Sequence, residues 1–409
     1  MAALRVLLSE GSSLTARETL TCLGSLGHRI EVVDPDPLCV ARFSRWTRRV
    51  HRGPCAAEDP RGYLETVGTL VEERAIDVVL PTHEQAWLFA VGAELGFEIP
   101  VAVAPAAAFD RVQGKVAFAE LLEVLALPQP LWRPVRSEED LSGFPLPYWL
   151  KADFGTAGRT VRAVRDEPSR AAAIEALLAG DQGPAMAQRP AEGQYGQAQA
   201  LFAHGRLLAV HTSVRRGVGM GGSAAARVGV DHPVVRGHVA ALGEALDWHG
   251  GITLDYFHVD GAPSYIECNP RTVEPGNAAA SGVNLPELQI ALTRGEDRPP
   301  TVRAGRAGVR THGLLALLLG AADRGASRRD LLGEVGAAIR GTGIYADSAE
   351  QLTPWRDPPS LAALAAVLAQ LLVSPRRAGD ITAGAVRRYS VGIEGVRRLR
   401  AGASPDGPA

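Results

Sequence analysis

The sequence has few of the residues and segments that mark secreted, zinc-binding or membrane proteins. Its 409 residues include only four cysteines, Cys22, Cys39, Cys55 and Cys268, whose spacing matches neither a zinc site nor a disulfide framework. No apolar run approaches the roughly 20 residues that a membrane span needs. The first residues also lack a basic segment followed by a long apolar stretch. We therefore expect a cytoplasmic protein without a membrane partner.

An excess of charge of one sign is also absent. Lys and Arg number 43, Asp and Glu number 45, and no block of basic residues occurs, which argues against a nucleic-acid partner. Lysine itself is nearly missing, because only Lys115 and Lys151 accompany the many arginines. A lysine is a compact, flexible point charge that arginine does not replace. These two lysines are therefore candidates for a functional role.

The pattern of elements changes along the chain. Before residue 107, strand and helix signals alternate, which predicts a parallel sheet covered on both faces. From residue 107 antiparallel strand signals with interspersed helices predict an α+β unit, and from about 303 helices dominate. The last segment, 401–409, is rich in Gly, Pro, Ser and Asp and is expected to be a disordered tail. The expected early elements are strands at Leu4–Leu8, Ile30–Val33, Ile76–Leu80 and Val101–Val103 and helices at Thr15–Leu26, Tyr63–Glu73 and Phe109–Leu125.

The strongest local signal is a hairpin. Asp260 and Gly261 separate two apolar runs, as in a tight turn between antiparallel strands. With the turn centred on Gly261, Asp255 lies directly across from Glu267, and Glu267 and Asn269 share one face. Facing like charges destabilise a sheet unless something neutralises them, and Mg²⁺ typically binds one or two carboxylates plus substrate phosphates. The alternative is an exposed strand face whose carboxylates are solvated.

A second signal is a strand, a glycine-containing loop and another strand around Lys151. Gly155 and Gly158 would let backbone N–H groups approach an anion, and Lys151 at the strand end would reach phosphates. No Gly-x-x-x-x-Gly-Lys-Ser/Thr motif occurs, and the turn after the first strand lacks Gly-x-Gly-x-x-Gly. The first absence excludes a P-loop, and the second leaves a dinucleotide site weakly supported.

Taken in order, these residues resemble the ATP-grasp superfamily, in the branch with carbamoyl-phosphate synthase-like, biotin carboxylase-like and carboxylate–amine ligase enzymes. The order is Lys115 on a helix, Lys151 before the glycine loop, the segment 185–190, Asp255, and then Ile-Glu-Cys-Asn-Pro-Arg ending at Arg271. The resemblance covers about residues 1–300. It implies an ATP-grasp fold of α/β and α+β units, divided into a Rossmann-like pre-ATP-grasp domain at 1–106, an ATP-grasp domain of two lobes at 107–302 with a hinge near 185–190, and a mostly helical domain at 303–400.

The resemblance also implies ATP and Mg²⁺ as cofactors, with Mn²⁺ as an alternative metal. Lys115 and Lys151 would contact the phosphates, and Gln188 with its neighbour Arg189 would form the hinge at the adenine. Arg215 and Arg227, on a segment between two predicted elements, are candidates for binding substrate carboxylates. The other implied roles are metal binding by Asp255, Glu267 and Asn269 and contact of Arg271 with the transferred phosphoryl group or the acyl phosphate.

The implied activity is that of an ATP-dependent ligase for small molecules. It would join a carboxylate to an amine through an acyl phosphate and release ADP and phosphate. The sequence departs from the family pattern at Ala152, where proline is common, at Arg159 in the loop, and at Asp255, where glutamate is more frequent. Two alternatives stay open: a bicarbonate-activating carboxylase or carbamoyl-phosphate-type enzyme, and a non-catalytic nucleotide-binding module. A homodimer stays open as well.

Overall fold

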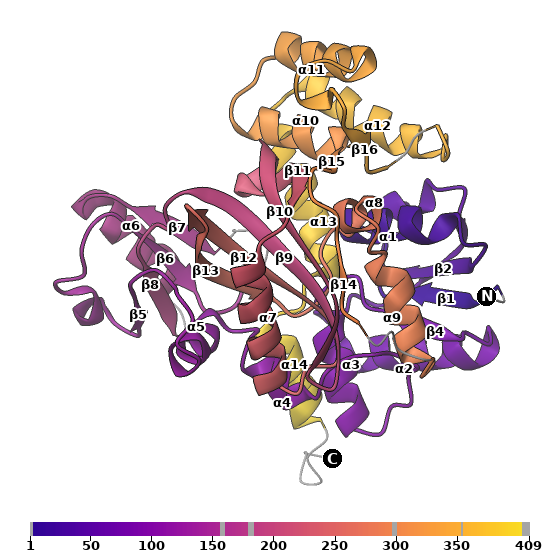
Figure 1. Cartoon of the computed structure of the whole chain (residues 1–409), viewed down its shortest axis with the longest axis horizontal. Coiled ribbons are helices and arrows are strands. Elements are labelled where there is room, and N and C mark those ends of the chain that lie inside the picture. The colour runs from indigo at the N-terminus through magenta and orange to yellow at the C-terminus, as the bar shows by residue number, and fades with distance from the viewer. Residues whose placement is uncertain (1–2, 156–159, 179–183, 297–300, 353–354, 403–409) are drawn as a thin grey trace.

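The computed structural model describes residues 3–155, 160–178, 184–296, 301–352 and 355–402 (Figure 1). Gly158 and Arg159 of the glycine loop and residues 403–409 of the expected tail lie outside these ranges. Within the described ranges, no helix has both the length and the apolar character that a membrane crossing requires.

The N-terminal part is a parallel sheet with helices on both faces (Figure 1). Its strands lie in the order β3-β2-β1-β4, and each neighbouring pair is parallel. Val6 and Leu8 pack with Leu20 of α1, whereas Leu7 packs with Leu64 of α2, because successive side chains of a strand point to opposite faces. The bounds are β1 Arg5–Leu8, α1 Leu14–Gly24, β2 Arg29–Asp34, β3 Thr47–Arg52, α2 Pro60–Glu73, β4 Val78–Leu80 and α3 Gln85–Glu94.

This sheet confirms the predicted class but corrects three details. β3 was not predicted, since it is an edge strand with basic, half-exposed residues instead of an apolar run. The predicted strand at Val101–Val103 is irregular; the chain there runs between Pro100 and Pro105, which lack N–H donors. Helix α3 was missed because its side chains from Gln85 to Gly92 are buried all round, so its sequence shows no amphipathic period.

The middle of the chain forms two further sheets. The smaller, with order β5-β8-β6-β7, is antiparallel throughout and lies beside α5 and α6 at the left of Figure 1. The larger has the order β13-β12-β9-β10-β11-β15-β16, with β14 beside β10. The smaller unit consists of α4 Ala106–Asp110, α5 Lys115–Val124, β5 Trp132–Val135, β6 Tyr148–Ala152, β7 Val161–Val164, α6 Glu167–Leu178 and β8 Ala185–Gln188. The larger consists of β9 Gln194–Ala203, β10 Arg206–Val218, β11 Ala224–Val230, α7 Pro233–Ala245, β12 Gly250–Val259, β13 Ala262–Asn269, α8 Gly276–Ala280, α9 Leu285–Thr293, β14 Arg303–Ala304, β15 Arg310–His312 and β16 Ala349–Glu350.

The predicted helix at Phe109–Leu125 is in fact two helices, α4 and α5. The chain is extended at Gly114, with φ −78° and ψ 138°, and α5 begins at the next residue, Lys115. A Cβ at Gly114 would lie 3.0 Å from the carboxylate oxygens of Asp153. The break therefore packs the start of α5 against the loop after β6 and fixes the position of Lys115.

The C-terminal region is mostly helical, as predicted, and ends against the N-terminal sheet. Helices α10 to α13 pack around Leu318, Leu331 and Leu371, and α14 then leaves them to pack on α2 and α3 (Figure 1). Val396 and Leu399 of α14 are buried in the core that contains α2 and α3. The bounds are α10 Leu314–Asp323, α11 Arg328–Arg340, α12 Ser360–Val373, α13 Arg377–Tyr389 and α14 Ile393–Ala401. Short 3₁₀ turns occur at Val40–Arg42, Glu138–Leu141, Met220–Gly222 and Gly343–Tyr345.

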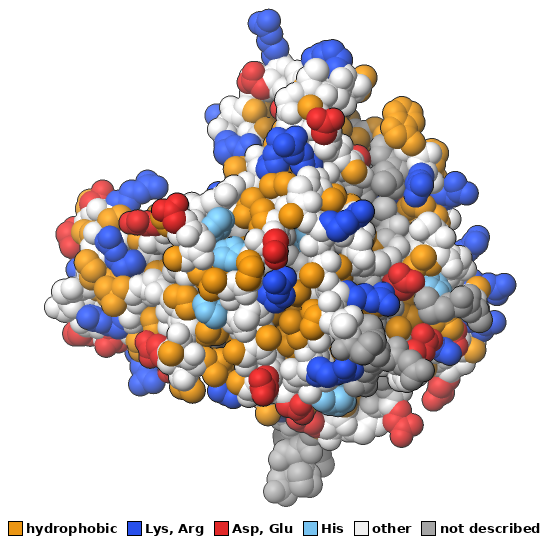
Figure 2. All heavy atoms as spheres, viewed as in Figure 1, with side chains coloured by type: hydrophobic (Ala, Val, Ile, Leu, Met, Phe, Trp, Pro, Cys, Tyr) orange, Lys and Arg blue, Asp and Glu red, His pale blue; other side chains and the backbone are white. Residues whose placement is uncertain are grey.

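The surface shown in Figure 2 carries Lys and Arg side chains dispersed among acidic and apolar ones. No single sign of charge is gathered over the elements that face the viewer in Figure 2. That face therefore presents a mixed surface rather than a concentrated electrostatic field.

A buried ion pair ties the first helix to the C-terminal region. Arg17 of α1 contacts Asp357, and both side chains are almost fully buried. Asp357 also accepts hydrogen bonds from the Ser44 hydroxyl and the Arg45 backbone N–H, each at 2.7 Å. The carboxylate thus joins three segments that are far apart in the sequence.

We expect Asp357→Ala to lower the free energy of unfolding by about 3–5 kcal/mol, because it leaves the buried Arg17 guanidinium without its counter-charge. Urea denaturation followed by circular dichroism measures the loss. Asp231→Ala is the matched control, since the pair of Asp231 with Arg236 at 3.1 Å is largely exposed and its loss costs at most about 1 kcal/mol. Equal losses in the two variants would contradict the structural role of Asp357.

Candidate functional site

The hairpin of β12 and β13 places two carboxylates opposite each other. Asp255 pairs directly with Glu267, which confirms the predicted pairing. The turn and the strand register that produce this pairing differ from the predicted ones, however. The turn is a tight two-residue one, with positive φ at both Asp260 and Gly261, and a bulge that leaves Ile266 unpaired restores the register. The bulge thus decides which residue faces Asp255.

Asp255 is a buried carboxyl group next to a like charge. Burial, and then the charge of Glu267, raise the pKa of Asp255 to about 7. Gln197 donates to its Oδ1 at 3.0 Å, and the Nδ2 of Asn269 lies 3.4 Å from its Oδ2. Because Asp255 is only 9% exposed, a solvated strand face does not describe it. Among the described residues, no group of three His, Cys, Asp or Glu side chains is arranged to hold a metal ion, so a metal here would need further ligands from a substrate.

Both lysines of the chain lie beside this hairpin. Lys151 on β6 is buried, and its Nζ lies 2.7 Å from Oε1 of Gln188 on the neighbouring strand β8. Burial lowers the pKa of Lys151 to about 8; the charge of Glu267 opposes this, and that of Lys115 adds to it. The charges of Glu267 and Lys115 are therefore close enough to act on Lys151.

The loop after β6 holds Lys115 in place. The Asp153 carboxylate accepts the Val116 backbone N–H at 2.8 Å, and Lys115 Nζ lies 3.4 Å from the carbonyl oxygens of Asp153 and Gly155. A Cβ at Gly155 would lie 1.9 Å from the Thr160 hydroxyl. A side chain at position 155 would therefore force Thr160 to move. The phosphate contact expected of Gly155 stays a prediction, and Gly158 lies outside the described residues.

Arg189, in the segment expected to form a hinge, makes structural contacts. Its Nη1 donates to the carbonyls of Leu146 and Pro147 at 2.6 and 3.1 Å, and its backbone N–H donates to Leu131 at 2.8 Å. Beside it is a cavity of about 350 Å³. The cavity is lined by Pro130, Leu131, Arg189, Pro190, Ala191, Glu192, Val259, Ala262 and Ser264. The guanidinium of Arg189 is therefore bound to the loop at residues 146–147, and the backbone after β8 adjoins this cavity.

Arg271 is buried at the end of the hairpin. Its backbone N–H donates to Asn269 O at 2.7 Å, its Nη2 lies 3.2 Å from Nε2 of His83, and its Nε has no hydrogen-bond partner among the described residues. Burial, and then the charge of Arg271, lower the pKa of His83 far below its ordinary value. The imidazole therefore stays neutral and accepts the hydrogen bond from Arg271.

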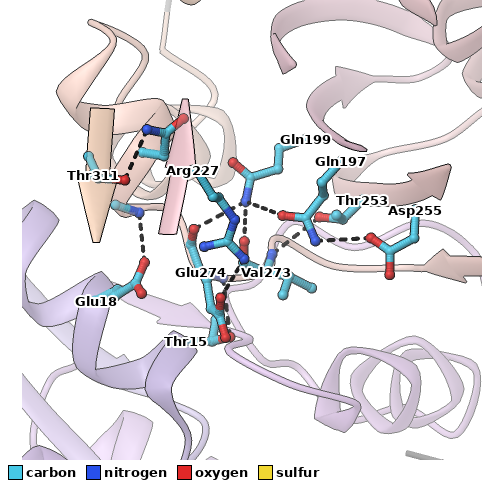
Figure 3. A network of polar contacts seen from close by, with 12 residues as sticks. Thr15, Glu18, Gln197, Gln199, Arg227, Thr253, Asp255, Val273, Glu274 and Thr311 are labelled. Atoms are coloured by element: carbon cyan, nitrogen blue, oxygen red, sulfur yellow. Dashed lines mark hydrogen bonds and ion pairs between the residues drawn. The ribbon is translucent and has the colours of Figure 1, made fainter. Parts of the chain in front are cut away.

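Arg227 belongs to a polar network on the same face of the large sheet (Figure 3). It pairs with Glu274 at 2.5 Å, while its Nε and Nη1 are buried and have no partner in the part of the chain that the structure describes. Glu18 of α1 accepts the Gly276 backbone N–H at 2.8 Å. Burial and Glu274 raise the pKa of Glu18 to about 8, with Arg227 opposing them. The first helix thus contributes a carboxyl group to the neighbourhood of Arg227.

Arg215 makes different contacts from Arg227, although the two are directly opposite in neighbouring strands. Its Nη1 donates to the carbonyl of Gly222 at 2.5 Å, and its guanidinium lies 5.1 Å from the centre of the Tyr195 ring. The Tyr195 side chain in turn lies close enough to Asp255 to oppose the rise in its pKa. Arg215 therefore touches the site through Tyr195.

Comparison with solved structures identifies the fold. The chain aligns with the biotin carboxylase domain of the Hydrogenobacter thermophilus 2-oxoglutarate carboxylase, in a complex with MgADP, ADP and bicarbonate, at a TM-score of 0.57 and 14% identity over 73% of this chain and 71% of that one. It aligns with an L-amino acid ligase from Bacillus licheniformis at a TM-score of 0.56 and 16% identity, over 71% and 74%. It aligns with the Staphylococcus aureus N5-carboxyaminoimidazole synthetase in complex with ADP at 0.60 and 13%, over 82% and 86%. The chain has the ATP-grasp fold.

These similarities are visible in three dimensions and faint in sequence. No protein-family model matches the chain, and no curated protein matches it significantly. The identities of 13–16% are low, so the solved ATP-grasp structures establish the architecture of this chain. Its substrates have to be inferred from its own residues.

Several residues of the site carry no motif and were not predicted. Gln199 donates to the carbonyls of Val273 and Glu274, and its Nε2 lies 3.4 Å from Oε1 of Gln197. It therefore links Glu274, which pairs with Arg227, to Gln197, which donates to Asp255 (Figure 3). One signal was available, because two glutamines two apart on a strand point to the same face. For Glu18, His83 and Glu274 the sequence offers no comparable signal.

We expect Glu267→Gln to leave the free energy of unfolding of the ligand-free protein unchanged or to raise it by up to about 1 kcal/mol, because it removes one of two facing charges. The raised pKa of Asp255 means that the folded state holds this proton more tightly than the unfolded state does. Protonation of Asp255 therefore stabilises the folded state below about pH 4, and this contribution is lost as the pH rises to about 7.

The gain from Glu267→Gln should consequently be larger at pH 8 than at pH 5 in urea denaturation without metal or nucleotide. Glu65→Gln, at an exposed position of α2, is the matched control and should show no such difference. A clear loss of stability in Glu267→Gln would instead mean that attraction to Lys151 outweighs repulsion by Asp255.

Proposed function

We propose that the protein is an ATP-dependent carboxylate–amine ligase that forms an amide bond between small molecules through an acyl phosphate. The observation that supports this most is the cluster of buried Lys151 and Asp255 with half-buried Glu267, with Arg271 at the end of the same hairpin. The cluster combines cations for phosphate groups with carboxylates for a divalent metal. It lies on a fold shared with ATP-grasp enzymes.

The hairpin residues fit Mg²⁺. Asp255, Glu267 and Asn269 offer two carboxylates and an amide oxygen, and the raised pKa of Asp255 reports a negative charge that the protein leaves poorly compensated. A bound Mg²⁺ would supply neutralisation of phosphate charge at this position. The chain's part is to hold these oxygens on one face of a rigid hairpin.

The groups around the hinge fit ATP. The cavity bounded by Pro190, Ala191 and Val259 adjoins Gln188 and suits the adenine, while Lys115 and Lys151 suit the phosphates. Because burial lowers the pKa of Lys151 to about 8, a nearby polyphosphate would favour its charged form. Binding of ATP would therefore compensate a charge that is costly to bury in the empty site.

Arg227 and Arg271 fit the reacting carboxylate. Both are buried and keep N–H groups without partners, and a carboxylate or acyl phosphate is the complementary acceptor. An oxygen of the substrate carboxylate attacks the γ-phosphorus of ATP, and the bond to the ADP oxygen breaks. The amine then attacks the acyl carbon, the bond to phosphate breaks, and the amine gives up a proton. The arginines position the acid and stabilise negative charge.

We expect the protein with Mg²⁺ and ATP to release ADP and phosphate when a suitable acid and amine are present. A panel of amino acids, singly and in pairs, together with bicarbonate, tests this. Hydroxylamine in place of the amine should trap the activated acid as a hydroxamate, with one ADP formed for each. Bicarbonate as the preferred acid would favour the carboxylase alternative, and AMP with pyrophosphate as products would contradict the proposal.

We expect Lys151→Arg to weaken MgATP binding by about tenfold or more, equal to about 1.4 kcal/mol, because a planar guanidinium does not fit the buried contact that the ammonium makes with Gln188. Isothermal titration calorimetry with MgATP measures the change. Arg294→Lys, at the end of α9 and half-exposed, is a control exchange of the same residue types. Unchanged affinity in Lys151→Arg would remove Lys151 from the phosphate site.

A further inference from the structure

The C-terminal segment inserts a tyrosine next to the site. Tyr389, the last residue of α13, lies against His83, with ring centres 4.1 Å apart and planes inclined by 40°. Its carbonyl accepts from the Gln85 side chain at 2.9 Å, and the Val391 backbone N–H donates to Glu84 at 2.7 Å. The backbone at the tyrosine and just after it is thus held by Glu84 and Gln85, the two residues directly after His83.

The segment that follows Tyr389 is firmly attached to the N-terminal part. Val391, Val396 and Leu399 are almost fully buried in the core that includes α2 and α3. Arg400 adds a 2.8 Å ion pair with Asp110. The position of Tyr389 is therefore built into the fold.

His83 connects this tyrosine to Arg271. Because its Nε2 accepts from Arg271, the neutral imidazole carries its proton on Nδ1, which is buried and has no partner among the residues that the structure describes. The Nε of Arg271 is also buried without one, and both side chains are 6% exposed. Buried donors without acceptors are costly, at about 1–3 kcal/mol each. The pair therefore presents two unused donors, which an anionic oxygen would satisfy.

The surroundings keep Tyr389 neutral. Burial, and then the carboxyl groups of Glu10 and Glu84, raise the pKa of its phenol above the ordinary value, while Arg271 opposes them. The residue thus offers an uncharged aromatic ring beside the two unused donors. A carboxylic acid whose carboxylate meets Arg271 and His83 would place its next group near this ring.

We propose that Tyr389 is a specificity-determining residue, which forms with His83 the wall against which the acid substrate lies. This rests on the proposed function. The acid that such a wall favours is an amino acid with an apolar or aromatic side chain, because a neutral ring binds apolar surface and planar groups well and offers no counter-charge to an ionic side chain.

The test uses the full-length protein and amino acids of graded side-chain size as the acid. Tyr389→Ala should raise KM for the acid that the wild type prefers by about tenfold, equal to about 1.4 kcal/mol. It should also shift the preference toward larger side chains, while KM for ATP stays within about twofold. Tyr389→Phe should restore most of the wild-type preference, because it keeps the ring. An unchanged order of preference in Tyr389→Ala, or a fall in kcat that is equal for every acid, would overturn the proposal.

A binding measurement separates this inference from the proposed function. If the wild type forms no ADP with any acid, the proposed function fails. Calorimetry with the same amino acids and a non-hydrolysable ATP analogue then tests the wall directly, and Tyr389→Ala should bind the preferred acid about tenfold more weakly. Equal binding by the two proteins would overturn the inference.

Two further variants distinguish a loss of the ring from a general loss of folding in Tyr389→Ala. Arg388→Ala changes the neighbouring residue, whose 2.8 Å pair with Asp36 is partly exposed, and should leave acid preference unchanged. His83→Gln keeps an acceptor for Arg271 but replaces the ring, and should weaken binding of the acid even if Tyr389→Ala folds poorly. A wild-type preference in His83→Gln would count against the wall.

Discussion

Asp255 and Glu267 face each other across two strands, and the buried ammonium of Lys151 lies within reach of the charge of Glu267. Bringing like charges together in a poorly hydrated place opposes folding, so other contacts must hold the hairpin. They are abundant: β12 pairs with β13 on one side and with β9 along its length on the other, and Tyr256 and Tyr265 next to the carboxylates are fully buried. These contacts hold the two carboxylates in place, and their charges are arranged for a ligand that would complete their neutralisation.

The remaining parts of the chain enclose this face. Helix α1 contributes Glu18, the loop after β4 contributes His83, and α13 contributes Tyr389, each from a different region of the sequence. Ion pairs and hydrogen bonds between distant segments, such as that of Arg17 with Asp357, hold these elements together. Enclosure matters chemically, because charges act more strongly on one another where water is excluded. The N-terminal sheet, which lacks a glycine-rich nucleotide turn, thus helps to enclose the site.

Local signals predicted the fold class and the hairpin, since alternation and an Asp-Gly turn are properties of short stretches. The pairing of Asp255 with Glu267 was predicted correctly, yet Ile266 bulges where a regular ladder had been assumed. The hydrogen bonds of Arg189 could not be predicted, because its carbonyl partners lie more than 40 residues away in the sequence and their positions depend on the path of the loop. Glu18 and Tyr389 were missed for the same reason. A side chain that reaches a site by long-range packing leaves no periodic trace in its own neighbourhood.

Nearly all of the basic residues are arginines, so residue type alone does not indicate which of them bind a substrate. Their hydrogen bonds distinguish the arginines that the fold uses from those with unpaired donors. Arg17 is matched by a buried carboxylate and Arg189 by backbone carbonyls, so each is accounted for by the fold. Arg227 and Arg271 are buried like Arg17, but within the described part of the chain Arg227 leaves Nε and Nη1 unpaired and Arg271 leaves Nε unpaired. A fold gains nothing from such donors, because their desolvation is not repaid within the protein. We expect such unpaired N–H groups where a bound ligand supplies the hydrogen-bond acceptor, and the carboxylate that the proposed reaction activates is an acceptor of that kind.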